Sequence, residues 1–302
     1  MTTTARLPVS LAWNAIALSL PEGWEISAMG KTYLQLDNGE RPVMELKWSP
    51  EGADPTTEAG FRRLARKIRQ SSKVRIVPSP APKAWKQALG RFEFRCFTWT
   101  GPEVNGLGAA LFCPKCRCAS VIQFMAQPNK ADSKALLEAC APAVLSSYTD
   151  HEPPEAVVYD VYDLQARLPR RFALQSYAFQ PGRFRLNLQA QGQDLELTRL
   201  APASALLQGG SLADLARKHF KDALPGEPTP AESSEDFASF RIPPAGPYKS
   251  ALMARAFRKK PFAALDVRLD REKDRILAVS LKSLAPWDED LMRWVGERFT
   301  AR

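Results

Sequence analysis

The sequence is poor in the residues that most often carry catalysis. Among 302 residues it has two histidines, His151 and His219, and neither stands in a pattern typical of a nucleophile, a general base or a metal site. No glycine-rich loop is flanked by the strand and helix that phosphate binding requires. We therefore assign no catalytic residue and expect a non-catalytic protein, for which the sequence indicates no small-molecule substrate.

Cysteines and long apolar runs are also scarce. Five cysteines are too few for the disulfide scaffold of a small secreted protein. No run reaches the ~20 apolar residues that a membrane-spanning helix needs, and the stretch 7–20 is interrupted by Pro8 and Asn14. We expect a cytoplasmic protein without a membrane span.

The sequence does contain one unit of about 150 residues written twice, a length typical of a single domain. Residues 20–24 (LPEGW) correspond to residues 168–172 (LPRRF), and the helices that follow share the letters LARK, at 64–67 and 215–218. The order strands, helix, strands, helix, with turns too short for parallel crossovers, predicts an antiparallel sheet. The predicted fold class is α+β, as two tandem copies of an antiparallel sheet covered by helices.

The domain boundaries follow from this repeat and from a proline pair at 153–154. We predict a first repeat over 1–150 that carries a cysteine hairpin, a linker over 151–166 and a second repeat over 167–302.

The opening Leu20, Pro21, Glu22, Gly23 and Trp24, followed by hairpins, one helix, a meander and a final helix, resembles the Mog1/PsbP-like α/β sandwich. The resemblance covers each copy in outline. It implies two tandem sandwiches of this type. Members of that superfamily are mostly binding or assembly factors, so the resemblance implies the same kind of role here.

A cysteine cluster, Cys113-Pro-Lys-Cys116-Arg-Cys118, is the sharpest local signal. A Cys-Pro-x-Cys turn at a hairpin tip is the shape of a zinc knuckle, so Cys113, Cys116 and Cys118 are the predicted metal ligands and zinc is the candidate metal. The fourth ligand would be solvent, a histidine such as His151, or a group of a partner. Two alternatives stay open: plain reduced cysteines, and thiol redox chemistry favoured by the neighbouring cations.

The net charge of +9 is concentrated locally. From Phe61 to Arg95 there are eleven lysines and arginines against one acid, Glu93, and the second repeat has a similar excess between Asp236 and Asp266. Such a field attracts phosphates, acidic lipid headgroups or an acidic protein surface. The predicted partner-binding residues are Arg62, Arg63, Arg66, Lys67, Arg69, Lys73, Arg255, Arg258, Lys259 and Lys260.

The leading hypothesis is a non-catalytic binding or assembly protein that docks on a larger, negatively charged protein or complex. One alternative is a nucleic-acid-binding protein that uses residues 61–95, with Trp85, Phe92, Phe94 and Trp99 as stacking groups. The other is a thiol-redox protein built on the cysteine cluster.

Overall fold

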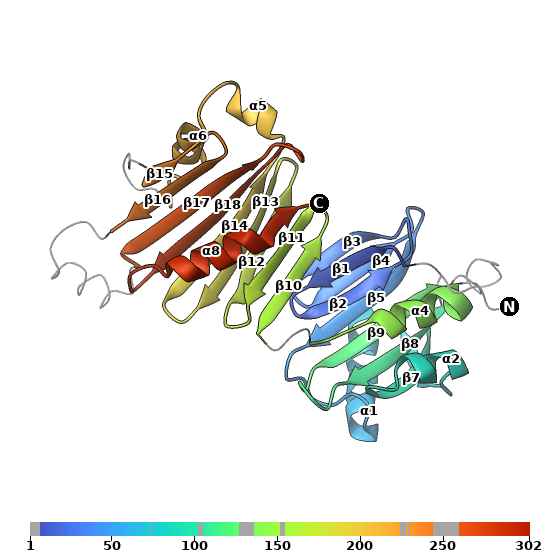
Figure 1. Ribbon diagram of the computed structural model, residues 1–302. Helices are drawn as coiled ribbons and strands as arrows, with labels where there is room; N and C mark the ends of the chain where they lie inside the picture. The colour runs from blue at the N-terminus through green and yellow to red at the C-terminus, as the bar shows by residue number, and fades with distance from the viewer. Residues whose placement is uncertain are drawn as a thin grey trace. The chain divides into compact units, whose positions relative to one another are not determined.

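The computed structural model describes residues 7–72, 74–101, 105–126, 136–151, 155–223, 228, 230–243 and 260–302. The chain divides into two compact units, unit 1 over Met1–Glu152 and unit 2 over Pro153–Arg302 (Figure 1).

Unit 1 is built on an antiparallel seven-stranded sheet in the order β3-β4-β5-β9-β8-β7-β6. Its strands are β3 (Glu25–Gly30), β4 (Tyr33–Asp37), β5 (Pro42–Ser49), β6 (Arg75–Pro78), β7 (Glu93–Thr100), β8 (Asn105–Phe112) and β9 (Ala119–Ala126). A hairpin precedes the sheet, β1 (Val9–Trp13) and β2 (Ile16–Leu20). The helices are α1 (Glu58–Ser72), α2 (Lys83–Ala88), a π-helical turn η1 (Leu136–Cys140) and α4 (Ala141–Ser147).

Unit 2 has a second antiparallel seven-stranded sheet in the order β12-β13-β14-β18-β17-β16-β15. Its strands are β12 (Ala173–Gln180), β13 (Arg183–Ala190), β14 (Gln193–Leu200), β15 (Glu232–Ser233), β16 (Phe237–Ile242), β17 (Phe262–Asp270) and β18 (Arg275–Ser283). A smaller sheet pairs β10 (Ala156–Val161), β11 (Leu164–Pro169) and β19 (Phe299–Ala301). The helices are α5 (Ala203–Leu207), α6 (Leu212–His219) and α8 (Glu289–Arg298).

The two units share one strand order, which extends to local irregularities. Both first strands of the large sheets carry a β-bulge at the same place, between Ile26 and Ala28 in β3 and between Leu174 and Ser176 in β12. In both units the chain returns after its last helix to pair with the second strand of the opening hairpin. The antiparallel, helix-covered sheet predicted from the sequence is therefore present in each unit, although the described residues are richer in strand than predicted.

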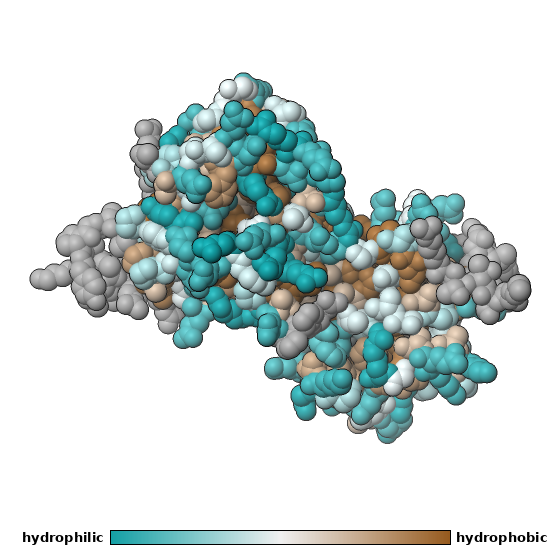
Figure 2. All heavy atoms as spheres, viewed as in Figure 1, coloured by the Kyte–Doolittle hydropathy of each residue, from teal (hydrophilic) through white to brown (hydrophobic). Residues whose placement is uncertain are grey.

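Strand alternation explains how the sheet of unit 2 is covered on both faces. Successive side chains of a strand point to opposite faces. Ile276 and Ala278 of β18 join the buried cluster that includes α6, whereas Leu277 and Val279 line a hollow together with Met292 of α8. Helix α8 lies across this second face, and hydrophilic residues dominate the surface over it (Figures 1 and 2).

The prediction of a linker over 151–166 is wrong, because most of this range forms strands of unit 2. The boundary between the units falls after Glu152, and β10 and the start of β11 lie inside the predicted linker. Every second residue of β10 is apolar and buried, namely Val157, Tyr159 and Val161, as expected for one face of a strand. None of the helices in the described residues is long and apolar enough to cross a membrane.

Candidate metal centre and cationic helix

The turn between β8 and β9 and the chain after α4 meet at one corner of unit 1. The turn is closed by two backbone hydrogen bonds, from Cys113 N to Cys118 O (3.0 Å) and from Arg117 N to Cys113 O (2.9 Å), with Arg117 at a φ of 59°. After α4, Thr149 exchanges two backbone hydrogen bonds with Ala17 of β2, at 2.7 and 2.8 Å. This bridge fixes the two residues that follow it beside the turn.

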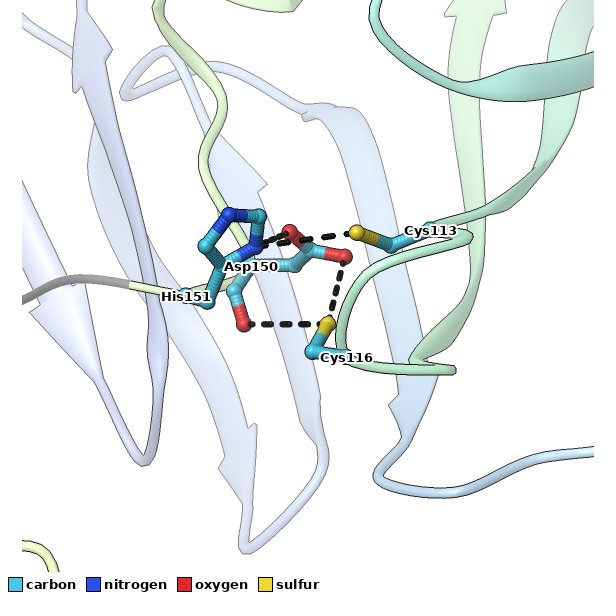
Figure 3. A group of neighbouring side chains, drawn as sticks. All are labelled: Cys113, Cys116, Asp150 and His151. Carbon is cyan, nitrogen blue, oxygen red and sulfur yellow. Dashed lines mark hydrogen bonds and ion pairs between the residues drawn. The ribbon is translucent and has the colours of Figure 1, made fainter. Parts of the chain in front are cut away.

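Four side chains converge at this corner: Cys113, Cys116, Asp150 and His151 (Figure 3). One ligand atom from each lies within 4.8 Å of all the others. Cys113 Sγ is 3.6 Å from His151 Nδ1, and the Cys116 thiol donates to Asp150 Oδ2 at 3.4 Å. His151 Nδ1 lies 2.7 Å from Asp150 Oδ1. The group could hold a metal ion.

Two of the separations between ligand atoms already suit a tetrahedral ion. With bonds of about 2.3 Å to sulfur and about 2.0–2.2 Å to nitrogen and oxygen, neighbouring ligand atoms of zinc lie about 3.3–3.8 Å apart. The separations of 3.6 Å between Cys113 Sγ and His151 Nδ1 and of 3.4 Å between Cys116 Sγ and Asp150 Oδ2 fall in this range. The contact between His151 and Asp150, at 2.7 Å, would have to widen.

Burial of the Asp150 carboxylate has an unfavourable desolvation energy when no metal ion is bound. The Asp150 side chain is 2% exposed, and its ion pair within the described residues is with His151, whose side chain is 42% exposed. Burial, with the neighbouring Cys113 and Asp150, raises the pKa of Cys116 to about 12, although the Cys118 backbone amide donates to it. The buried carboxylate of Asp150 beside the buried thiol of Cys113 and the half-buried thiol of Cys116 suits a cation.

Cys118, the third predicted ligand, is not in this group. Its Sγ lies 3.7 Å from Ser120 Oγ, which in turn lies 2.7 Å from the Tyr148 hydroxyl in the interior. Burial raises the pKa of Cys118 to about 11. His151 was among the alternatives for the fourth ligand, but Asp150 was missed, because nothing in the sequence shows that the Thr149 bridge would place the residue after it at the hairpin tip.

The predicted basic surface is concentrated on α1. Phe61 is buried and Leu64 and Ile68 are half-buried, whereas the cations between them are exposed: Arg62, Arg63, Arg66, Lys67 and Arg69. Arg62 forms an (i, i+4) ion pair with Glu58 at 3.3 Å. Within the described part of the chain, the other four have no carboxylate partner. Helix α1 therefore presents a row of unneutralised positive charge.

The remaining predicted partner-binding residues contribute little to this surface. Lys260 of unit 2 forms an ion pair with Asp194, so its charge is already neutralised. Four predicted residues lie outside the described residues: Lys73, Arg255, Arg258 and Lys259.

The aromatic residues proposed for base stacking are mostly interior. Trp85 is fully buried, and Phe92 and Trp99 are 7% and 8% exposed. Trp85 packs edge-on against Phe124, and Phe92 packs against Tyr148. These rings, from α2, the bend before β7 and β7 itself, belong to the core of unit 1.

No protein-family model and no curated protein matches this chain. Among solved structures, an immunity protein of the type VI secretion system (T6SS), TplEi from Pseudomonas aeruginosa in complex with an "L" peptide, is 12% identical over 97% of this chain and 98% of that chain, with a TM-score of 0.30. The same protein in its apo form gives 13% identity, 97% coverage of both chains and a TM-score of 0.31. A protein from Bacteroides thetaiotaomicron is 11% identical over 52% of this chain and half of its own length, with a TM-score of 0.29. Scores this low define neither the fold nor the function of this chain.

Proposed function

We propose that this protein is a non-catalytic binding or assembly protein that docks on a negatively charged protein partner through the exposed face of α1. The observation that supports the proposal is the row formed by Arg63, Arg66, Lys67 and Arg69, which has no carboxylate partner among the described residues. Exposed cations without an intramolecular partner contribute little to folding stability, and their field raises the association rate with an anionic partner. The shared strand order also agrees with two tandem Mog1/PsbP-like sandwiches, which we include in the proposal.

A protein partner suits this surface better than a nucleic acid. Non-specific binding of single strands combines a cationic groove with exposed aromatic side chains. Three of the four candidate aromatics, Trp85, Phe92 and Trp99, are buried, and Arg95 is already paired with Glu58 at 2.8 Å. The fourth candidate, Phe94, is half-buried, and α1 itself presents no exposed aromatic side chain, because its Phe61 is buried.

The test is purification of the tagged full-length protein from its host, with and without nuclease treatment. Replacing Arg63, Arg66, Lys67 and Arg69 by Glu should abolish capture of a specific acidic protein, and nuclease should not. The matched control is Lys218→Glu on α6, because Lys218 occupies the place of Lys67 in the second LARK segment and is also exposed. Unchanged capture by the quadruple variant would reject α1 as the contact surface, and loss on nuclease treatment would favour the nucleic-acid hypothesis.

We further propose that Cys113, Cys116, Asp150 and His151 hold a structural zinc ion. Two thiolates, one imidazole and one carboxylate form a closed tetrahedral set, which leaves no open position for catalysis. The ion would tie the β8–β9 turn to the chain after α4. Because thiol ligands must stay reduced, this agrees with a reducing cytoplasm, and all five cysteines are free.

Elemental analysis tests the zinc proposal. Protein purified under reducing, chelator-free conditions should carry close to one equivalent of zinc, and a variant combining Cys113→Ser with Cys116→Ser should carry none. Cys118→Ser should keep the metal. Loss of zinc from the Cys118→Ser variant would instead support the ligand set predicted from the sequence, and metal-free wild-type protein would overturn the proposal. The thiol-redox hypothesis is weaker, because the pKa values of about 12 for Cys116 and about 11 for Cys118 leave both thiols protonated at neutral pH.

A further inference from the structure

An open groove of about 450 Å³ runs between α1 and strands β5 and β9 of unit 1. Its floor is apolar and half-buried, made by Leu64 and Ile68 of α1 and by Ala119 and Val121 of β9. Arg63 and Lys67 line it from the helix side. We call this hollow the α1 groove.

In unit 2 most of the corresponding positions are buried. The LARK segments align Leu64 with Leu215, and the αL residues of the two hairpin turns, Arg117 and Asp274, align β9 with β18. By this alignment, Ala119 and Val121 correspond to Ile276 and Ala278.

Three of the four counterparts in unit 2 are buried, at 5% exposure for Leu215, 0% for Ile276 and 1% for Ala278. The fourth, His219 at the place of Ile68, is half-buried and lines a different hollow, against β13 and β14. The α1 groove is therefore not a general property of the repeat. It is specific to unit 1.

The element that helps to close unit 2 is α5. This short helix lies between β14 and α6 in the chain, and it packs Ala203, Leu206 and Leu207 against the cluster that contains Ile276 and Ala278. In unit 1 the corresponding connection, residues 50–57, has no helix. In unit 2, therefore, a segment of the same chain with two adjacent leucines, α5, covers the positions that correspond to the floor of the α1 groove.

The charges around the α1 groove favour an acidic segment. Arg63 and Lys67 are exposed and have no carboxylate partner among the described residues. Asp54, a carboxylate in the lining, already accepts hydrogen bonds from Thr56 N and Thr56 Oγ1, each at 2.7 Å. An occupant that brings carboxylates would neutralise the two cations while its apolar side chains cover Leu64, Ile68 and Val121.

We propose that the α1 groove binds a short segment of the partner protein in which leucine-like side chains are flanked by carboxylates. The inference rests on the proposed function, because it identifies the part of the acidic partner that α1 contacts. It adds that the contact is a groove with an apolar floor and two specific cations, rather than the whole basic face of the helix.

The probe is a fluorescein-labelled synthetic peptide that copies residues 202–208 and carries two glutamates at each end. We expect it to bind the full-length protein saturably, and to bind at least tenfold more weakly when its two leucines are replaced by serine. Combining Arg63→Gln with Lys67→Gln should weaken binding about tenfold, since an exposed charge pair is worth up to ~1 kcal/mol. The matched control is Arg66→Gln with Arg69→Gln, on the same helix but outside the lining, with an expected change below about twofold.

Each other outcome overturns the inference. Equal weakening by the two pairs of substitutions would show docking by diffuse charge, and an unaffected serine peptide would show that the apolar floor is not used. A concentration-dependent dimer of this chain, seen by analytical ultracentrifugation and dissociated by the peptide, would assign the groove to self-association. Failure of the peptide to bind, while the quadruple Glu variant still loses its partner, would reject the α1 groove and leave the proposed function standing.

Discussion

The same corner of the fold is held together by different chemistry in the two units. In unit 1 the β8–β9 turn meets the chain after the last helix through Cys113, Cys116, Asp150 and His151. The corresponding β17–β18 turn of unit 2 has no cysteine, and Arg275 stands at the place of Cys118. Arg275 Nε donates to Asp163 Oδ2 at 2.9 Å, and Arg199 Nε donates to Asp163 Oδ1 at 3.0 Å.

The opening hairpins show the same contrast. Trp48 at the end of β5 donates its indole N–H to Asn14 O in the β1–β2 turn, at 3.2 Å. Arg199, near the end of β14, reaches Asp163 in the β10–β11 turn and lies over the Phe184 ring. In both units these turns are therefore held by side-chain contacts, but the residues that make the contacts differ. Two arginines around one carboxylate, Asp163, complete the corner in unit 2. The sulfur-rich corner of unit 1 has a buried carboxylate, Asp150, for which a metal ion would provide positive charge.

The largest expected effect is on unit 1 alone. If zinc binds the corner, a free zinc concentration of a thousand times Kd should stabilise unit 1 by about 4 kcal/mol relative to protein in a chelator. Hydrogen exchange on the full chain measures this, because protection should rise in β8 and β9 and stay constant in β17 and β18. Equal protection of both hairpins in zinc and in chelator would contradict the comparison.

The pH dependence of zinc binding has a defined sign. Burial raises the pKa of Cys116 to about 12, so the metal-free thiol is protonated at neutral pH and must lose its proton to bind. Zinc affinity should therefore rise with pH, by about tenfold per pH unit for each thiol proton released. Competition with a chromophoric chelator between pH 6 and pH 8 measures the slope, and a flat profile would exclude thiolate ligation.

An intermediate effect is expected in unit 2. Asp163→Asn should destabilise this unit by about 3 kcal/mol, because it leaves Arg199, whose side chain is 6% exposed, without its charge partner. The control is Asp194→Asn, whose partner Lys260 forms a more exposed pair with it, with an expected loss below ~1 kcal/mol. Denaturant unfolding of the two variants gives both values. Equal losses would show that the corner of unit 2 does not depend on its arginines.

Much of the architecture could be read from the sequence, because the repeat exposes it. The LARK helices and the LPEGW opening located the two copies, and short turns gave the antiparallel sheet. The opening hairpins were missed: the first ~17 residues were interpreted as a lead-in with one added strand, and residues 151–166 as a linker. Their turns place Ala15 and Tyr162 at positive φ, where a glycine or an asparagine would have marked the turn in the sequence.

The candidate site was only half predictable. The Cys-Pro-x-Cys letters mark a local turn, so Cys113 and Cys116 could be found by spacing. Asp150 joins them through the pairing of Thr149 with Ala17, which are far apart in the sequence, and no local pattern encodes such a contact. Cys118 was chosen by proximity in the chain, but its sulfur lies beside Ser120. The α1 groove likewise depends on how closely α1 and α6 each pack against their sheets, which is a tertiary property that local sequence does not encode.

The smallest expected effect concerns a compensating pair in the two sheets. Trp99 of β7 pairs with Gly106 of β8, and the corresponding pair in unit 2 is Ile242 with Ala263. A Cβ on Gly106 would overlap the Trp99 indole and the Phe124 carbonyl oxygen. Gly106→Ala should therefore destabilise unit 1 by about 2 kcal/mol, because overpacking a filled sheet face forces its neighbours to shift.

A double-mutant cycle with Trp99→Ile sharpens this prediction. Replacing Trp99 by the residue of unit 2 removes the indole from above Gly106, so the two substitutions together should cost about 1 kcal/mol less than the sum of their separate losses. The rescue should be partial, since the contact with the Phe124 carbonyl belongs to the backbone and remains. Strict additivity in denaturant unfolding would mean that Gly106 is needed for its backbone alone, and that the two units differ at this pair in strand geometry rather than in side-chain volume.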